Sequence, residues 1–279
     1  MTSERVVRLG AVEYLNARPL VYGLMRSPRF DLRFDVPSEC ARLLHANVID
    51  VGLIPSIEYA RGAYCIAPDV AIVSRGPVAS VGLFTRKPIA DVRSIALDTS
   101  SRTSVALVRV LCARAFSIRP SLADYAPDLD AMLAACDAAL VIGDNALFLG
   151  DPRPPGAHAL KGDPPGPGIQ KIDLGEVWTA MTGLPFVYAF WAGRSGALVG
   201  DEVAELRRAR DGGVCHTEEL AREYFSGAPD RQPVGAAYLR DNIKYDLGAD
   251  ERAGLELFYQ YAAEAGVVNA APPLRFFGG

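Results

Sequence analysis

The chain has few of the residues that build metal sites and disulfide frameworks. It contains five cysteines and three histidines. The cysteines are odd in number, far apart and mostly set among apolar neighbours, which is typical of buried thiols in a reducing compartment. His45, His158 and His216 form no pair with ligand spacing. The sequence therefore predicts neither a structural zinc site nor a histidine-based catalytic triad.

The sequence also lacks the marks of a nucleic-acid-binding or membrane protein. Lys and Arg number 29 against 33 Asp and Glu, a formal net charge of −4, and there is no basic block or zinc-finger spacing. No apolar run approaches the roughly 20 residues that span a bilayer. The opening, MTSER, has no basic start followed by an apolar stretch and a cleavage site. We expect a cytoplasmic protein that binds neither nucleic acid nor membrane; its oligomeric state is left open.

Half of the 279 residues are hydrophobic and 22% are charged, which is typical of a folded globular chain long enough for one large domain or two lobes. Strand-like and helix-like segments alternate, and this pattern favours parallel α/β sheets. The predicted strands are 6–12, 32–36, 48–54, 66–74, 81–85, 94–97, 138–142, 169–174 and 187–193. The predicted helices are 19–25, 39–47 with Ser38 as N-cap, 105–116, 129–135, 146–149, 175–182, 201–211, 217–225, 233–242 and 249–265. The Pro- and Gly-rich residues 151–168 predict an exposed loop.

Polar residues gather where four predicted strands end. They are Tyr14-Leu15-Asn16, Pro55-Ser56, the segment 99–104 and Asp144-Asn145. In α/β sheets, ligands bind beyond the carboxyl ends of the strands. One or two of these clusters would be ordinary turns or caps, but four from separate strands predict one shared pocket.

The richest cluster is LDTSSRTS at 97–104, where five hydroxyl side chains crowd the turn between a strand and a helix. A helix N-terminus presents free backbone N–H groups and the positive end of a dipole, so it attracts anions. The hydroxyls add neutral donors, and the segment predicts a site for a carboxylate or phosphate. The alternative is a redundant helix cap.

Six sequence blocks span nearly the whole chain in a fixed order. They are 10–20 (GAVEYLNARPL), 50–59 (DVGLIPSIEY), 74–81 (SRGPVASV), 97–107, 137–147 (DAALVIGDNAL) and 173–191 with TGLPF at 182–186. Together they resemble the motifs of the chorismate dehydratase family, which opens the futalosine route to menaquinone. The resemblance implies an α/β fold of the periplasmic-binding-protein-like type II, with two lobes and a ligand cleft between them. We expect lobe 1 at 1–86 plus 192–279 and lobe 2 at 87–191.

The resemblance implies a carbon–oxygen lyase that removes water from chorismate to give 3-(1-carboxyvinyloxy)benzoate without a cofactor or metal. The proton leaves C3 and the hydroxyl leaves C4, so developing charge spreads onto the ring carboxylate, and hydrogen bonds to that carboxylate stabilise the transition state. The substrate carries two carboxylates, which implies two anion sites. Arg102 would pair with a carboxylate or point to solvent, and Asn145 would donate to a hydroxyl or carboxylate. The expected substrate-binding residues are Ser56, Ser80, Ser101, Arg102, Thr103, Ser104 and Asn145.

Three groups are candidates for taking the proton. Asn16 is expected nearest the reacting carbon, although an N-cap role would also explain it. Asp144 is the stronger base by pKa, although an Asp that follows a strand is commonly a cap. The enolpyruvyl carboxylate of the substrate is the third candidate, and the sequence does not choose among them.

Aromatic residues near the strand ends are candidates for the walls of the pocket. Tyr14 and Tyr188 would flank the substrate ring, whereas Phe186 and Trp191 are expected in the core.

Two other functions remain open from the sequence. A protein of the same fold could bind a small anion without catalysis, although the absence of a signal peptide counts against transport. The sister 1,4-dihydroxy-6-naphthoate synthase is similar in fold but uses a histidine of the second lobe. Here that lobe has only His158, in the predicted loop, and this together with the Tyr-Leu-Asn opening favours the dehydratase.

Overall fold

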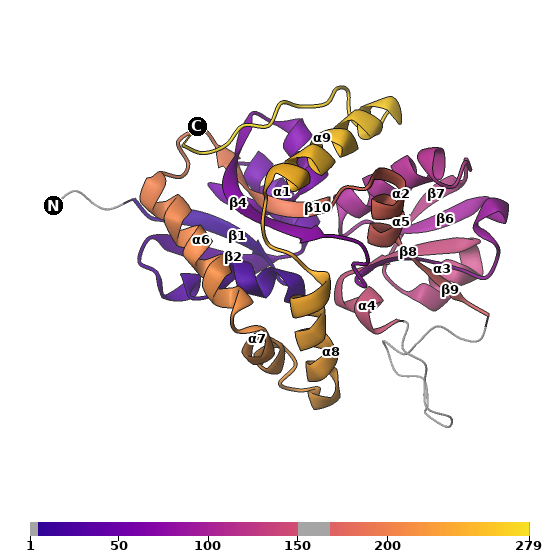
Figure 1. Cartoon of the computed structure of the whole chain (residues 1–279), viewed down its shortest axis with the longest axis horizontal. Helices are drawn as coiled ribbons and strands as arrows, with labels where there is room; N and C mark the ends of the chain where they lie inside the picture. Colours follow the sequence, from indigo (N-terminus) through magenta and orange to yellow (C-terminus); the bar gives the residue numbers. More distant parts are fainter. Residues whose placement is uncertain (1–4, 150–167, 279) are drawn as a thin grey trace.

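The computed structural model describes residues 5–149 and 168–278, which form two five-stranded mixed sheets with helices around each (Figure 1). The predicted loop at 151–168, with His158, lies outside the described residues except for Gly168. The expected α/β class and two-lobe architecture are confirmed. The helices are α1 (Pro37–His45), α2 (Arg102–Arg114), α3 (Leu129–Ala135), α4 (Gly143–Phe148), α5 (Leu174–Thr182), α6 (Gly200–Val214), α7 (Thr217–Tyr224), α8 (Gln232–Ala237) and α9 (Ala249–Glu264).

The first sheet has the strand order β2-β1-β3-β10-β4. Strand β1 is parallel to β2 and β3, while β10 is antiparallel to β3 and β4. Every residue of β3 is buried, as is all of β10 except its last residue, so both read as continuous apolar runs with no alternation. The strands are β1 (Val7–Val12), β2 (Phe30–Asp35), β3 (Val51–Pro55), β4 (Tyr64–Ser74) and β10 (Phe186–Arg194).

The second sheet has the order β7-β6-β8-β5-β9. Strand β6 is parallel to β7 and β8, and β5 is antiparallel to β8 and β9. The edge strand β7 was not predicted because its sequence, SLADY, has no buried position and so no apolar face to recognise. The strands are β5 (Val81–Thr85), β6 (Ser94–Asp98), β7 (Ser121–Tyr125), β8 (Ala138–Ile142) and β9 (Gln170–Asp173).

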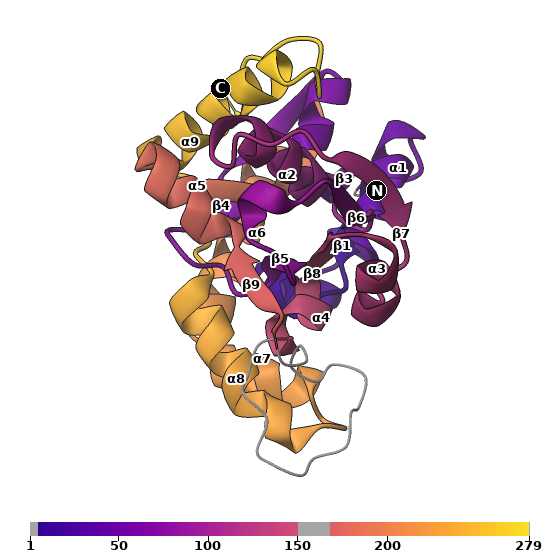
Figure 2. The same ribbon diagram turned by 90° about the vertical axis from the view of Figure 1, so that its right-hand side faces the viewer.

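The chain passes between the sheets after β4 and again before β10. Strand β5, placed in lobe 1 by the limit at residue 86, belongs to the second sheet, and most of β10, placed in lobe 2, belongs to the first. We propose that lobe 2 comprises residues 81–182 and that 75–80 and 183–185 are the crossings. Helix α9 contacts both β10 and α2, and it lies at the opposite end of the molecule from α7 and α8 in both ribbon views (Figures 1 and 2).

Three predicted helices differ from the observed ones in their first residue or in their type. The segment after β1 is a 3₁₀ helix, Leu15–Val21, which begins four residues before the predicted start. Helix α1 begins at Pro37, so its N-cap is Val36 and the predicted cap at Ser38 is wrong. The predicted helix 233–242 is α8 followed by a π-helix, Tyr238–Asn242. The remaining 3₁₀ segments are Leu24–Arg26, Ser56–Arg61, Ile89–Asp91 and Pro229–Arg231.

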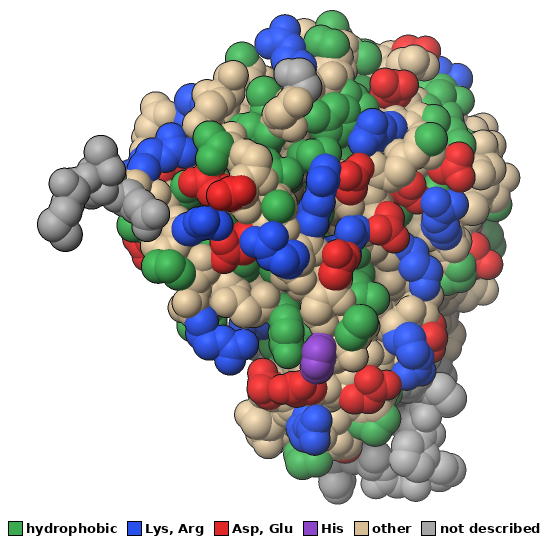
Figure 3. Space-filling model, turned by 60° about the vertical axis from the view of Figure 1, so that its left-hand side comes forward, with side chains coloured by type: hydrophobic (Ala, Val, Ile, Leu, Met, Phe, Trp, Pro, Cys, Tyr) green, Lys and Arg blue, Asp and Glu red, His purple; other side chains and the backbone are tan. Residues whose placement is uncertain are grey.

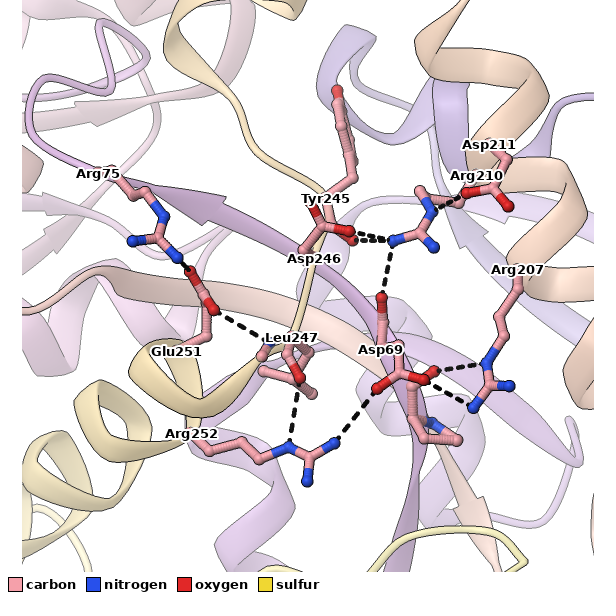
Figure 4. Close-up of polar contacts among 12 residues, drawn as sticks. Asp69, Arg75, Arg207, Arg210, Asp211, Tyr245, Asp246, Leu247, Glu251 and Arg252 are labelled. Carbon is pink, nitrogen blue, oxygen red and sulfur yellow. Dashed lines mark hydrogen bonds and ion pairs between the residues drawn. The ribbon is translucent and has the colours of Figure 1, made fainter.

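A network of ion pairs holds the C-terminal part of the chain against the first sheet (Figure 4). Asp69, at a left-handed turn of β4 (φ 67°), receives Arg207 of α6 at 2.7 Å and Arg252 of α9 at 3.3 Å. The guanidinium of Arg210 donates to the backbone oxygens of Asp69 and Tyr245. These contacts fix the segment between the π-helix and α9, which also reaches the site described below.

The surface is of mixed charge on the face that Figure 3 shows, where basic and acidic side chains are interspersed. Within residues 5–149 and 168–278, no helix has both the length and the apolarity of a membrane-spanning segment. All five cysteines lie in this part of the chain and are free, but only Cys40 and Cys112 are buried, so the expectation of mostly buried thiols is only partly confirmed.

Candidate active site

A pocket lies between the two lobes, at the ends of strands from both sheets. Residues from β1, β3 and β10 of the first sheet and from β5 and β8 of the second contribute to its wall. Most of the lining is aliphatic or proline, and none of the described lining residues carries a charge. The polar side chains that line it are Tyr14, Asn16, Ser80, Ser101, Ser104 and Tyr188.

Asn16 is the second residue of the 3₁₀ helix that follows β1. Its side-chain oxygen is buried and has no hydrogen-bond partner among the described residues. Its backbone oxygen accepts from the hydroxyl of Tyr245 at 3.0 Å, which holds the turn in place. The N-cap position is occupied by Tyr14 without a side-chain cap, so the capping explanation of Asn16 is wrong. An unpartnered buried acceptor on a pocket wall is suited to a ligand.

Ser80 is presented by a tight turn in the first crossing. The backbone N–H of Ser80 donates to the oxygen of Val78 at 2.7 Å, and Ala79 between them has φ 60°, which describes a strained γ-turn. The carboxylate of Asp173 holds the turn by accepting from the N–H groups of Val78 and Ala79. The backbone N–H of Gly143 donates to the backbone oxygen of Ser80 at 2.8 Å, so the turn is also bound to lobe 2.

Ser101 and Ser104 lie at the N-terminus of α2. The Ser101 hydroxyl oxygen accepts from Ser104 N at 3.4 Å, and the two hydroxyl oxygens are 3.1 Å apart. Ser101 therefore caps the helix, and both side chains also line the pocket. The capping and binding interpretations are compatible, because the contact between the two hydroxyls uses only one of their two protons and the other can be donated to a ligand.

Ser56 and Thr103 do not line this pocket. Both are fully buried, and their hydroxyl oxygens lie 3.3 Å apart across the junction of the lobes. Ser56 donates to the oxygen of Val187 at 2.8 Å, and Ile57 N donates to the Thr103 hydroxyl at 3.1 Å. The structure thus gives these two residues the role of joining the lobes.

Arg102 points away from the pocket. Its guanidinium pairs with Glu58 at 3.1 Å, and the Glu58 side chain is only 1% exposed. The same carboxylate receives His45 Nε2 at 2.8 Å, while His45 Nδ1 lies 2.6 Å from the Tyr64 hydroxyl. The sequence expectation for Arg102, a substrate carboxylate or open solvent, did not include this intramolecular pair.

Asp144 and Asn145 line a second, neighbouring pocket with Tyr14, Arg18 and Tyr224. Asp144 accepts from the Tyr224 hydroxyl of lobe 1, and the backbone N–H of Leu15 also favours its charged form. Burial raises the pKa of Asp144 above its ordinary value, and these hydrogen bonds act in the opposite direction. The N-cap of α4 is Ile142, so the expected capping role of Asp144 is wrong.

The aromatic residues divide as expected. Tyr14 and Tyr188 line the pocket, whereas Phe186 and Trp191 are fully buried in the core. Burial raises the pKa of Tyr14 to about 12 and raises the pKa of Tyr188 well above its ordinary value, so both remain neutral hydrogen-bonding groups.

The C-terminal segment was missed as part of the site. Tyr238 donates its hydroxyl proton to Ser80 Oγ at 2.7 Å, Tyr245 holds the backbone of Asn16, and Ile243 lines the pocket. Tyr238 and Tyr245 are more than 150 positions from Ser80 and Asn16, so no local sequence pattern predicts these contacts. Among the described residues, no cluster of His, Cys, Asp or Glu is arranged to hold a metal ion.

A family model described as menaquinone biosynthesis matches residues 7–264 of the chain. The chain belongs to this menaquinone biosynthesis family. A chorismate dehydratase from Thermus thermophilus, which is 32% identical over 260 residues, matches 90% of this chain and 93% of that protein.

Solved structures place this member of the menaquinone biosynthesis family in the expected fold class. A crystal structure of an Archaeoglobus fulgidus protein matches with a TM-score of 0.71 at 16% identity, covering 96% of this chain and all of that one. A Candida albicans protein described as having the generic periplasmic binding protein fold matches with a TM-score of 0.59 at 13% identity, covering 96% and 92%. The periplasmic-binding-protein-like fold is therefore confirmed.

Proposed function

We propose that the protein is a chorismate dehydratase that eliminates water to give 3-(1-carboxyvinyloxy)benzoate. Membership of the menaquinone biosynthesis family supports this assignment. The observation that carries it is one pocket between the lobes whose lining combines Asn16 with the hydroxyl side chains of Ser80, Ser101 and Ser104. The Asn16 side-chain oxygen is buried there and has no partner among the described residues.

Neutral donors at this pocket suit the charge that the reaction develops. Loss of the proton from C3 spreads charge through C2 and C1 onto the ring carboxylate of the substrate. The hydroxyls of Ser101 and Ser104 and the positive end of α2 lie at one wall of the pocket, and we assign them to that carboxylate. Ser80 comes from the first crossing and is assigned to the enolpyruvyl carboxylate.

Asn16 is our first candidate for the group beside C3. A carboxamide is a weak base, so its oxygen orients the reacting C–H or passes its proton on to the enolpyruvyl carboxylate of the substrate. Asp144 is a better base, but it lines the neighbouring pocket, where it accepts from the Tyr224 hydroxyl. We therefore assign Asp144 to holding the 3₁₀ helix that carries Asn16, through the N–H of Leu15.

No cofactor is needed in this proposal. Elimination of water leaves the oxidation level of the substrate unchanged, and formation of the benzene ring supplies the driving force. We further propose that the enzyme acts in the cytoplasm, in agreement with its five free cysteines.

Incubation of the purified protein with chorismate tests the proposal. The ultraviolet spectrum and the mass of the product should show loss of one water and formation of 3-(1-carboxyvinyloxy)benzoate. Asn16→Ala, purified in the same way, is the control that excludes a contaminating activity. Tight binding of chorismate without turnover would instead indicate a small-anion binding protein, and neither binding nor turnover would contradict the assignment.

A further inference from the structure

Tyr238 lies behind the pocket wall and is only 2% exposed. It is the first residue of the π-helix, and its hydroxyl donates to Ser80 Oγ at 2.7 Å. Burial raises the pKa of Tyr238, so the hydroxyl keeps its proton at neutral pH. Because Tyr238 itself does not line the pocket, it can act on a ligand only through Ser80 or another lining residue.

The direction of this hydrogen bond decides whether the Ser80 hydroxyl can donate its proton to a ligand. Each hydroxyl has a single proton to donate. Tyr238 uses its proton on Ser80 Oγ, and the Ser80 proton must then point elsewhere. Among the described residues, none accepts a hydrogen bond from Ser80 Oγ, and the γ-turn keeps this side chain on the pocket. The Ser80 proton is therefore available to an anion.

Asn16 is a second polar side chain that acts on Tyr238. Its side chain interacts with the Tyr238 hydroxyl and opposes the rise in the pKa of Tyr238. Since the tyrosine proton is used on Ser80, only the amide N–H₂ of Asn16 can approach the tyrosine oxygen favourably. This orientation agrees with the Asn16 side-chain oxygen being buried without a partner.

We propose that Tyr238 is a positioning residue that sets the hydrogen-bond direction of the pocket. It makes Ser80 a donor to a substrate carboxylate and leaves the Asn16 oxygen as the acceptor beside the reacting carbon. The carboxylate assignment rests on the proposed function. One buried hydroxyl thereby prepares both a donor and an acceptor before the substrate arrives, which reduces reorganisation in the transition state.

A double-mutant cycle tests this inference. The variants are Tyr238→Phe, Ser80→Ala and the pair, and the measurement is the Kd of 3-(1-carboxyvinyloxy)benzoate by calorimetry together with kcat and KM for chorismate. We expect Tyr238→Phe to weaken binding about 5- to 10-fold. In the Ser80→Ala background the same change should alter Kd less than about twofold, because the tyrosine reaches the substrate carboxylate only through the serine.

Tyr59→Phe is the matched control. Tyr59 is also buried, and its hydroxyl donates to the oxygen of Pro273 and accepts from the N–H of Arg275, each at 2.9 Å and away from the pocket. This variant should lose a comparable amount of thermal stability and keep the wild-type Kd. A Tyr238→Phe variant that binds like the wild type, or effects that multiply in the double variant, would overturn the inference.

A neutron structure of the wild-type protein gives the same answer without a substitution. A deuterium on Ser80 Oγ that points into the pocket is expected, and one that points at Tyr238 Oη would overturn the inference. Failure of the proposed function is distinguishable, because wild-type protein that binds the benzoate but does not turn over chorismate leaves the binding cycle intact. Protein that does neither overturns both proposals.

Discussion

The two sides of the lobe junction use opposite chemistry. The pocket described above has no charged side chain among its described lining residues. A groove on the other side, here called the outer groove, is lined by Ile57, Val105 and the charged side chains of Glu58, Arg61, Arg102, Arg109 and Asp124. The buried contact between Ser56 and Thr103 lies between them, since Pro55 lines the pocket and Ile57 the groove.

This difference teaches where the protein uses charge. In the outer groove, Arg102 of lobe 2 and Glu58 of lobe 1 pair with each other and join the lobes. In the pocket, an anion would meet hydroxyls and a helix end, which are held by the backbone and need no counterion when the pocket is empty. Ser101 and Arg102 are adjacent in the chain but lie on opposite sides of this division.

The largest effect is expected for Asn16→Ala. If the amide oxygen acts at the reacting carbon, kcat should fall about 100-fold or more, with Kd for the benzoate product changed less than about threefold. Asn145→Ala is the control, because Asn145 is exposed in the neighbouring pocket. A variant Asn16→Ala with wild-type kcat would remove Asn16 from the chemistry.

The next largest effect concerns stability and the outer groove. Glu58→Gln removes the buried charge that Arg102 and His45 share. The free energy of unfolding should fall by roughly 2–3 kcal/mol, less than for a fully buried pair because Arg102 is partly exposed. Urea unfolding measures this, with Arg109→Ala as the surface control. KM for chorismate should stay within about twofold of wild type; a large rise would place the outer groove in substrate binding.

A smaller effect is expected for Ser104→Ala. Loss of one neutral donor to the ring carboxylate should raise KM about 5- to 10-fold, and kcat should fall as well, because the charge on this carboxylate grows in the transition state. Arg102→Ala, two residues away, should leave KM unaltered, since its guanidinium faces Glu58. Steady-state kinetics of the two variants side by side would reverse our comparison if Arg102→Ala raised KM and Ser104→Ala did not.

The smallest effect is a pH dependence at Asp144, an acid at the lobe junction with no ion pair among the described residues. Its pKa in the folded protein is raised from 3.8 by burial, so the folded state binds the proton more tightly than the unfolded chain. Its contribution to stability is therefore largest in acid and is lost as the pH rises through the folded pKa. Relative to wild type, Asp144→Asn should gain stability between about pH 4 and pH 7. Urea unfolding across this range would contradict the prediction if the difference between the proteins stayed constant.

The sequence by itself determined the α/β class, most strands and helices, and four polar strand ends. These features are local, because apolar runs, glycines and hydroxyl-rich turns determine the conformation of residues only a few positions away in the sequence. It also carried the family blocks, and the expected residues Asn16, Ser80, Ser101 and Ser104 do lie on one pocket.

Only the tertiary structure decided which neighbouring side chain faces which side. Thr103 joins the lobes and Arg102 pairs with Glu58, while Ser101 and Ser104 line the pocket, and this division depends on how α2 packs against Ser56 and Ile57 of the other lobe. Tyr238 reaches Ser80 from 158 residues away. Such contacts depend on how distant segments of the chain pack together, and the spacing of residues in the sequence does not predict them.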